Sequence, residues 1–137
     1  MAAIEDAVFE KTNPFVAARS FESCRFRDCD LTGMNLDGLE LIDCRFVSCN
    51  LSNARLGGAT LNGVDFKGCK LLGVDFSACS KLLLRVAFAD CKLDYASFHK
   101  LDLRRAGFER CGLVEADFTE ANLAGARLAD CDLAGAR

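Results

Sequence analysis

Residues 21–56 read FESCR FRDCD LTGMN LDGLE LIDCR FVSCN LSNAR L, in which Phe or Leu returns at every fifth position. The same spacing continues to residue 76 and, after one interruption, holds from residue 88 to residue 133. Neither an α-helix nor a simple strand has a period of five, whereas a fixed internal period is typical of a solenoid. The repeat therefore predicts a solenoid before any other feature is considered.

A second small or apolar residue lies two positions before each Phe or Leu, as Cys24 does before Phe26 and Cys44 before Phe46. Residues two apart on an extended backbone point to the same side, so both positions are expected to face inward. Five residues with two inward places require a corner in every repeat. Eight of the eleven glycines follow a repeated Phe or Leu by two positions, where a tight corner favours glycine.

Residues of one kind also recur every twenty positions, with two extra residues between the two halves of the chain. One such series contains Phe26, Phe46, Phe66, Phe88 and Phe108, and another contains Cys29, Cys49, Cys69, Cys91, Cys111 and Cys131. Twenty is four fives, so like residues are expected to stack once per four-sided coil, about 4.8 Å apart. The sequence thus predicts an all-β protein, a four-sided parallel β-helix of about six coils.

Several repeats also carry a family signature. The runs ADFTE at residues 116–120, ANLAG at 121–125 and CDLAG at 131–135 resemble the A(D/N)LxG repeat of the pentapeptide-repeat proteins. The resemblance extends over residues 21–135. It implies the fold of that family, a right-handed quadrilateral β-helix, which agrees with the period of twenty.

The chain divides into residues 1–20, which break the repeat and are expected to cap the first coil, and residues 21–137, the β-helix. Such a cap covers apolar surface and free strand edges. The other end stops in mid-repeat at Arg137, whereas the proteins it resembles commonly continue to a terminal helix. Either further residues follow, which we favour, or another copy covers the end. If nothing follows Arg137, we expect an end-to-end homodimer through the C-terminal coil.

The interruption of the repeat is a net insertion of two residues within residues 77–85, which read SACSKLLLR. We expect Leu83 to replace Lys81 as the inward residue, with two residues bulging from one corner. A bulge of this kind re-aims side chains and often lies beside a functional site. A harmless corner insertion is the simpler interpretation.

Charge is uneven around the insertion. Residues 81–110 carry seven Lys or Arg against four Asp or Glu, although the whole chain has a net charge of −3. One coil separates Arg85 from Arg105, so the two are expected to share an outer column, with Arg104 beside it. The candidate interaction patch is Lys81, Arg85, Arg104 and Arg105. Solvated charge on a solenoid flank is the alternative interpretation.

No residue pattern indicates catalysis or a cofactor. All nine cysteines occupy the smaller inward position, which favours buried, reduced thiols in a cytoplasmic protein over disulfides or a metal site. The single histidine, His99, follows Phe98 and is expected to face solvent. No stretch is long and apolar enough to span a membrane, and no motif indicates nucleotide binding. An enzyme, a cofactor and direct nucleic-acid binding are therefore not expected.

Two functions remain from the sequence. The first is a cytoplasmic protein-interaction or scaffold solenoid, because stacked repeats present extended flat surfaces to a protein partner. The second is implied by the resemblance to the quinolone-resistance (Qnr-like) branch of the family, whose members mimic duplex DNA and bind a type II topoisomerase such as DNA gyrase. This chain lacks the long loops of that branch and is locally basic, whereas a DNA mimic requires an acidic docking face. The first function is therefore preferred.

Overall fold

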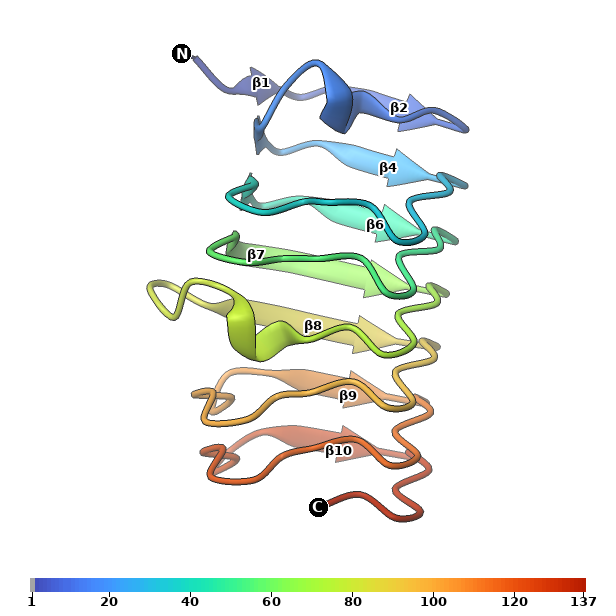
Figure 1. Cartoon of the computed structure of the whole chain (residues 1–137), viewed down its shortest axis with the longest axis vertical. Helices are drawn as coiled ribbons and strands as arrows, with labels where there is room; N and C mark the ends of the chain where they lie inside the picture. The colour runs from blue at the N-terminus through green and yellow to red at the C-terminus, as the bar shows by residue number, and fades with distance from the viewer. Residues whose placement is uncertain (1) are drawn as a thin grey trace.

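The computed structural model describes residues 2–137, which wind into a right-handed stack of about six coils with the two termini at opposite ends (Figure 1). Every strand pairing among these residues is parallel. The strands are β1 Ile4–Glu5, β2 Val8–Glu10, β3 Ser20–Glu22, β4 Arg25–Arg27, β5 Glu40–Ile42, β6 Arg45–Val47, β7 Thr60–Lys67, β8 Arg85–Ala89, β9 Gly107–Glu109 and β10 Arg127–Ala129. Two 3-10 turns, Pro14–Val16 and Phe76–Ala78, complete the elements. The predicted all-β solenoid is confirmed.

The register confirms the period of twenty. Phe26 pairs with Phe46 and Phe46 with Phe66, then Phe66 pairs with Phe88 across the insertion and Phe88 with Phe108. The centroids of successive rings in this series lie 4.6, 5.0, 5.2 and 5.2 Å apart, so the five rings form one vertical stack. Isolated parallel bridges keep the same spacing on the other sides of the coils.

The core is a column of phenylalanine and leucine side chains with smaller residues between them. A second stack of rings, Phe76, Phe98 and Phe118, has centroid spacings of 5.0 Å and meets the first stack edge-on. Inward cysteine, alanine and valine side chains fill the smaller positions of each repeat. Since each coil packs only on its neighbours, the coil rather than the whole chain is the unit of packing.

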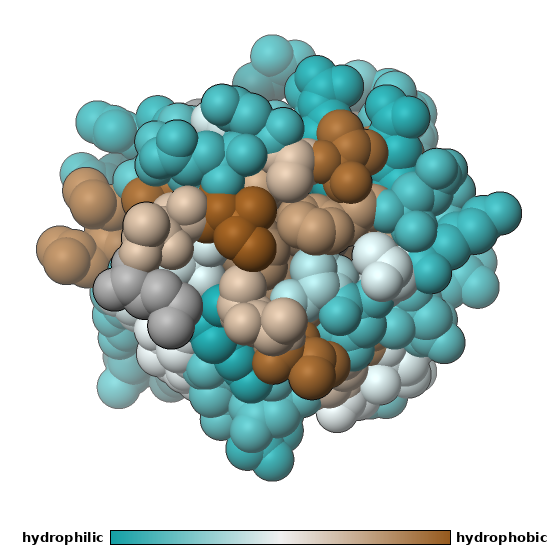
Figure 2. Space-filling view, turned by 90° about the horizontal axis from the view of Figure 1, so that it is seen from above, coloured by the Kyte–Doolittle hydropathy of each residue, from teal (hydrophilic) through white to brown (hydrophobic). Residues whose placement is uncertain are grey.

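The N-terminal residues, which were expected to cap the first coil, pair with it as strands. Strands β1 and β2 pair with β3 and β4, so residues 4–10 already form two sides of a coil and the β-helix begins before Phe21. Their spacing is seventeen residues, as between Phe9 and Phe26, which hides them from the periodic pattern. Phe15, on the following 3-10 turn, is fully buried with its ring 4.9 Å from that of Phe26. Figure 2 shows apolar residues at the centre of this end, ringed by hydrophilic ones.

The insertion also differs from the prediction. The backbone N–H of Ser80 donates to the carbonyl of Ala59, so the coil keeps its register up to residue 80. Register returns where Arg85 pairs with Asn62, and no residue pairs with Gly63 before Val86 pairs with Val64. Three residues, 81–83, therefore loop out, and one residue is missing at the next corner. The prediction that Leu83 faces inward is wrong, because Leu83 is 65% exposed and Leu84 packs against the core instead.

Candidate functional site

The inserted loop, residues 81–83, projects from the side of the stack beside β8 (Figure 1). It holds Leu82 and Leu83 in solvent, 73% and 65% exposed. The Ser80 hydroxyl accepts a hydrogen bond from the Leu82 N–H at 3.3 Å, and Leu83 has a left-handed φ of 58°. Leu84 anchors the loop on the core. Two adjacent exposed leucines on an ordered loop are a candidate contact for a partner.

The structure brings three of the four predicted basic residues together at this loop. Lys81, Arg104 and Arg105 line a hollow of about 410 Å³ together with Leu83, Leu84 and Asp102. Arg85 lines a neighbouring hollow of about 500 Å³, to which Arg105 also contributes. We call the second one the corner hollow. Because Ala87 pairs with Gly107, Arg105 lies one coil beyond Arg85, as the sequence predicts.

These four cations differ in whether a neighbouring carboxylate neutralises their charge. Arg104 donates to both carboxylate oxygens of Asp102, at 2.9 and 2.7 Å, and holds the pKa of that carboxyl down, to about 2. Arg85 lies 3.5 Å from Asp43. Among residues 2–137, Lys81 and Arg105 have no carboxylate within 4.0 Å. The charges available to a partner are therefore chiefly those of Lys81 and Arg105.

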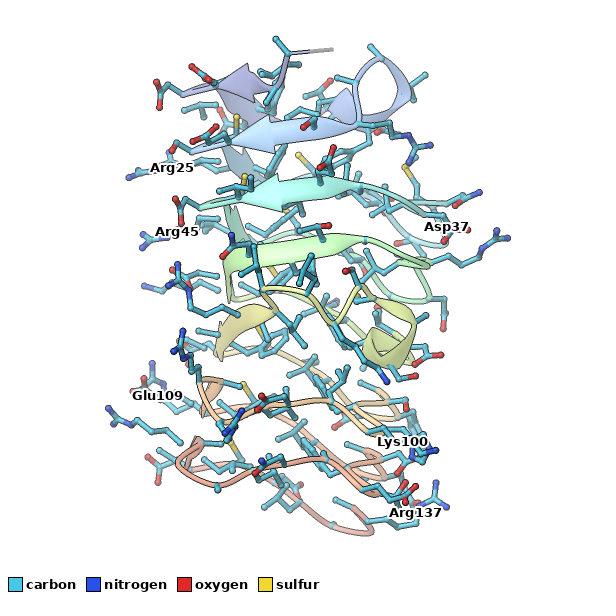
Figure 3. The ribbon with its side chains drawn as sticks, turned by 90° about the vertical axis from the view of Figure 1, so that its left-hand side faces the viewer. Arg25, Asp37, Arg45, Lys100, Glu109 and Arg137 are labelled. Carbon is cyan, nitrogen blue, oxygen red and sulfur yellow. The ribbon has the colours of Figure 1, made fainter. Side chains whose placement is uncertain are left out.

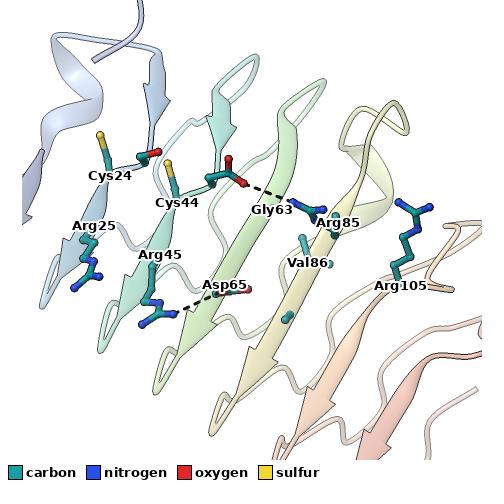
Figure 4. Close-up of a pocket in the computed structure, with 12 residues that line it drawn as sticks. Cys24, Arg25, Cys44, Arg45, Gly63, Asp65, Arg85, Val86 and Arg105 are labelled. Atoms are coloured by element: carbon teal, nitrogen blue, oxygen red, sulfur yellow. Dashed lines mark ion pairs between the residues drawn. The ribbon is translucent and has the colours of Figure 1, made fainter. Parts of the chain in front are cut away.

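The corner hollow contains functional candidates that the sequence analysis missed (Figure 4). Arg25 on β4 and Arg45 on β6 are register partners and line its N-terminal part. Arg45 lies 3.9 Å from Asp65, and Asp43 reaches Arg85 across the coil that holds Gly63. The signal for Arg25 and Arg45 was present in the sequence, because the two arginines are twenty residues apart.

The cysteines are structural in this arrangement. Eight of the nine are buried, Cys131 is partly exposed, and all are free thiols. The Cys49 Sγ, for example, donates to the Phe26 carbonyl at 3.2 Å. The labelled charged side chains, such as Arg25, Arg45 and Glu109, project outward from the stack (Figure 3). Burial raises the pKa of the Cys44 thiol to about 11 and that of Cys79 to about 12. Buried, protonated thiols such as those of Cys44 and Cys79 are poor nucleophiles and poor metal ligands.

No group of three or more metal-ligating side chains occurs among residues 2–137. His99 lies at the surface, as predicted, and its Nδ1 forms a hydrogen bond of 2.7 Å with Thr119 Oγ1. No helix in the described part of the chain is long and apolar enough to cross a membrane.

Comparison with known proteins agrees with the fold. The family model described as "Pentapeptide repeat region" matches residues 19–81, and the one described as "Pentapeptide repeats (8 copies)" matches residues 111–137. The chain belongs to the pentapeptide-repeat family. No curated protein matches it.

This pentapeptide-repeat protein is similar to two solved structures. HetL, from the cyanobacterium Nostoc sp. strain PCC 7120, is 26% identical with a TM-score of 0.59, over 85% of this chain and 59% of HetL. HetL is described as involved in the regulation of heterocyst differentiation. A trypsin-treated form of QnrB1, a plasmid-mediated fluoroquinolone resistance protein, is 26% identical with a TM-score of 0.43, over 98% of this chain and 72% of QnrB1. The chain thus spans less than two thirds of HetL.

Proposed function

We propose that this pentapeptide-repeat protein is a non-enzymatic interaction or scaffold module that binds another protein through the loop at residues 81–83. The observation that carries the proposal is the exposure of Leu82 and Leu83 beside Lys81 and Arg105. Burying a leucine side chain in a partner contributes about 1.5–3 kcal/mol, and rim cations add orientation and association rate. The nine free thiols support a reducing, cytoplasmic location.

The test compares proteins co-purified from cells of the source organism with the wild-type chain and with Leu82→Ser/Leu83→Ser. A matched control is Tyr95→Ser, which removes an equally exposed apolar side chain, 67% exposed, at another corner. We expect a partner that is lost with the loop variant and kept with the control. If the captured proteins are the same with all three chains, the loop is not the docking site.

The alternative, a DNA-like binder of a type II topoisomerase, is less well supported. A mimic of duplex DNA requires negative charge over its docking face. The outer face of β4 and β6 instead carries Arg25, Arg27 and Arg45, and the adjoining corner carries Arg85 and Arg105. A gyrase supercoiling assay tests this alternative, and inhibition or quinolone protection at stoichiometric protein would favour it over a scaffold.

We also propose that a chain ending at Arg137 forms an end-to-end homodimer. The last coil exposes Leu128 and Leu133 by 37% and 43%, and β10 pairs only with β9, which leaves one strand edge open. Open edges and apolar ends favour association. Light scattering should report a dimer for the 137-residue chain and a monomer for Leu133→Asp. A monomer at high concentration for the unmodified chain would contradict the dimer.

A further inference from the structure

The hollow beside the inserted loop, which we call the loop hollow, lies between two segments of the chain. One segment is the loop itself, and the other is the corner that lies one coil later. The volume of the hollow is about 410 Å³. Its lining residues are Lys81, Leu83, Leu84, Asp102, Arg104 and Arg105. The insertion therefore builds one wall of this hollow.

The lining of the loop hollow has an excess of two positive charges. Its cations are Lys81, Arg104 and Arg105, and its one carboxylate belongs to Asp102. Arg104 donates to both oxygens of this carboxylate, at 2.9 and 2.7 Å, so these two charges offset each other. Lys81 and Arg105 have no carboxylate within 4.0 Å in the part of the chain that the structure describes, residues 2–137. The two uncompensated charges are therefore those of Lys81 and Arg105.

The three cations supply hydrogen-bond donors from both walls of the loop hollow. The ammonium group of Lys81 has three N–H donors, and the guanidinium group of Arg105 has five. Asp102 accepts from Nε and Nη2 of Arg104, which holds this guanidinium in place and leaves its Nη1 for another acceptor. A ligand in the hollow therefore meets donors from the loop on one side and from the next coil on the other.

Two leucines give the loop hollow an apolar side. Leu84 packs against the core, whereas Leu83 is 65% exposed although it lines the hollow. A free inorganic ion would leave Leu83 in water, but the carbon atoms that carry an anionic group would bury it. The hollow is therefore suited to an anion that is attached to an organic side chain.

We propose that the loop hollow binds a phosphate monoester, carried by a phosphorylated side chain of the partner protein. Such a group has a charge of about −1.5 to −2 at pH 7 and three acceptor oxygens. It therefore matches the two uncompensated cations, Lys81 and Arg105, whereas a carboxylate has a single charge and leaves one of them unpaired. The inference rests on the proposed interaction function and adds that phosphorylation of the partner controls binding.

An anionic membrane fits this side of the stack less well. Glu40 pairs with Thr60, and the N–H of Ser80 donates to the carbonyl of Ala59, so Glu40 lies two coils from Ser80 in the same column. Asp43 lies nearby, 3.5 Å from Arg85. A bilayer surface extends over several coils and would meet these carboxylates, whereas one phosphorylated side chain enters the hollow without meeting them.

The test measures binding of phenyl phosphate and phenyl sulfate to the whole protein, from the shifts of its backbone amide signals in NMR spectra. The two probes share the ring and the tetrahedral anionic group, but above about pH 7 the phosphate is chiefly a dianion and the sulfate a monoanion. The protein variant is Lys81→Gln/Arg105→Gln. The matched control, Arg27→Gln/Lys70→Gln, removes one exposed arginine and one exposed lysine from other sides of the stack.

We expect phenyl phosphate to bind at least about fivefold more tightly than phenyl sulfate, with the largest shifts at residues 81–85 and 102–105. The Lys81→Gln/Arg105→Gln variant should lose this preference and the matched control should keep it. Equal binding of the two probes, or equal losses in the two variants, would overturn the phosphate site. The protein should also stay in solution when vesicles of phosphatidylcholine and phosphatidic acid are sedimented, and co-sedimentation would identify a lipid phosphate as the ligand instead.

Phosphatase treatment of the cell extract separates this inference from the proposed interaction function. A partner that the Leu82→Ser/Leu83→Ser chain fails to capture should also be lost when the extract is treated with phosphatase before it meets the wild-type chain. If the wild-type chain captures that partner equally before and after the treatment, the interaction function stands and the phosphate site fails.

Discussion

Replacing Phe66 by alanine perturbs the centre of the first ring stack. Phe66 is 2% exposed, its ring lies 5.0 Å from that of Phe46 and 5.2 Å from that of Phe88, and Phe76 meets it edge-on at 6.4 Å. Removing the ring forfeits about 2–3 kcal/mol of burial free energy. The space cannot collapse, because backbone hydrogen bonds to the coils above and below hold the strand, so a cavity term adds to the loss. The expected cost is roughly 3–5 kcal/mol of unfolding free energy.

The assay is urea denaturation followed by far-ultraviolet circular dichroism, with equal m-values for the variant and the wild type as the condition for comparison. Phe118→Ala is the matched control, because Phe118 is only partly buried, at the C-terminal end of the second stack, 5.0 Å from Phe98. Its ring is flanked in its own stack on one side only, so its loss should cost roughly half as much. A cost below about 1 kcal/mol at Phe66, or a larger cost at Phe118, would refute the stacked-core reasoning.

Three further outcomes test other features of the structure. Gly63→Ala should lower the unfolding free energy by about 2 kcal/mol in thermal or urea denaturation, because the alanine backbone is strained and its methyl group disrupts the contact of Arg85 with Asp43. Gly33 has a φ of +66° but open surroundings, so Gly33→Ala should cost only about 1 kcal/mol, from backbone strain alone. Equal costs would contradict the contact. Thiol labelling of the native protein should modify Cys131 first and the other eight thiols only on unfolding, and fast labelling of most thiols would show that they are accessible. The unfolding free energy should fall as the pH rises above 9, because burial raises the pKa values of Cys44 and Cys79 and these thiols ionise first in the unfolded chain. The expected fall is about 1.4 kcal/mol per pH unit for each thiol, levelling off near pH 11 to 12. Urea titrations at several pH values check this, and replacing both thiols by alanine should weaken the dependence.

The coil could be predicted because its inward residues repeat. Phe26, Phe46 and Phe66 recur at the period of one coil, and burial leaves those positions little chemical freedom. The first coil could not, since its spacing of seventeen matches no later repeat and Phe15 reaches the core from a 3-10 turn. Leu83 and Leu84 are the same residue type, so only the backbone hydrogen bond of Ser80 decides which of them turns inward.

The candidate site was predicted in part. The period of twenty residues correctly predicted that Arg105 lies one coil beyond Arg85, because both residues follow the insertion and share one register. It missed Arg25 and Arg45, since the charge excess that drew attention begins only at Lys81. The repeat period could not predict the contact of Arg85 with Asp43. This contact crosses an intervening coil and depends on Gly63 having no side chain.

The chain returns to the register of the coils after residue 83, so the loop is a suitable site for an insertion. Three residues loop out and one is omitted at the next corner, yet Phe66 still stacks on Phe88. Residues added between Leu82 and Leu83 should therefore leave the packing of the core unchanged. A foreign epitope, a tag or a second domain inserted there would sit on a rigid rod. The number of coils on each side of the loop would then fix the distance of the inserted element from either end of the stack.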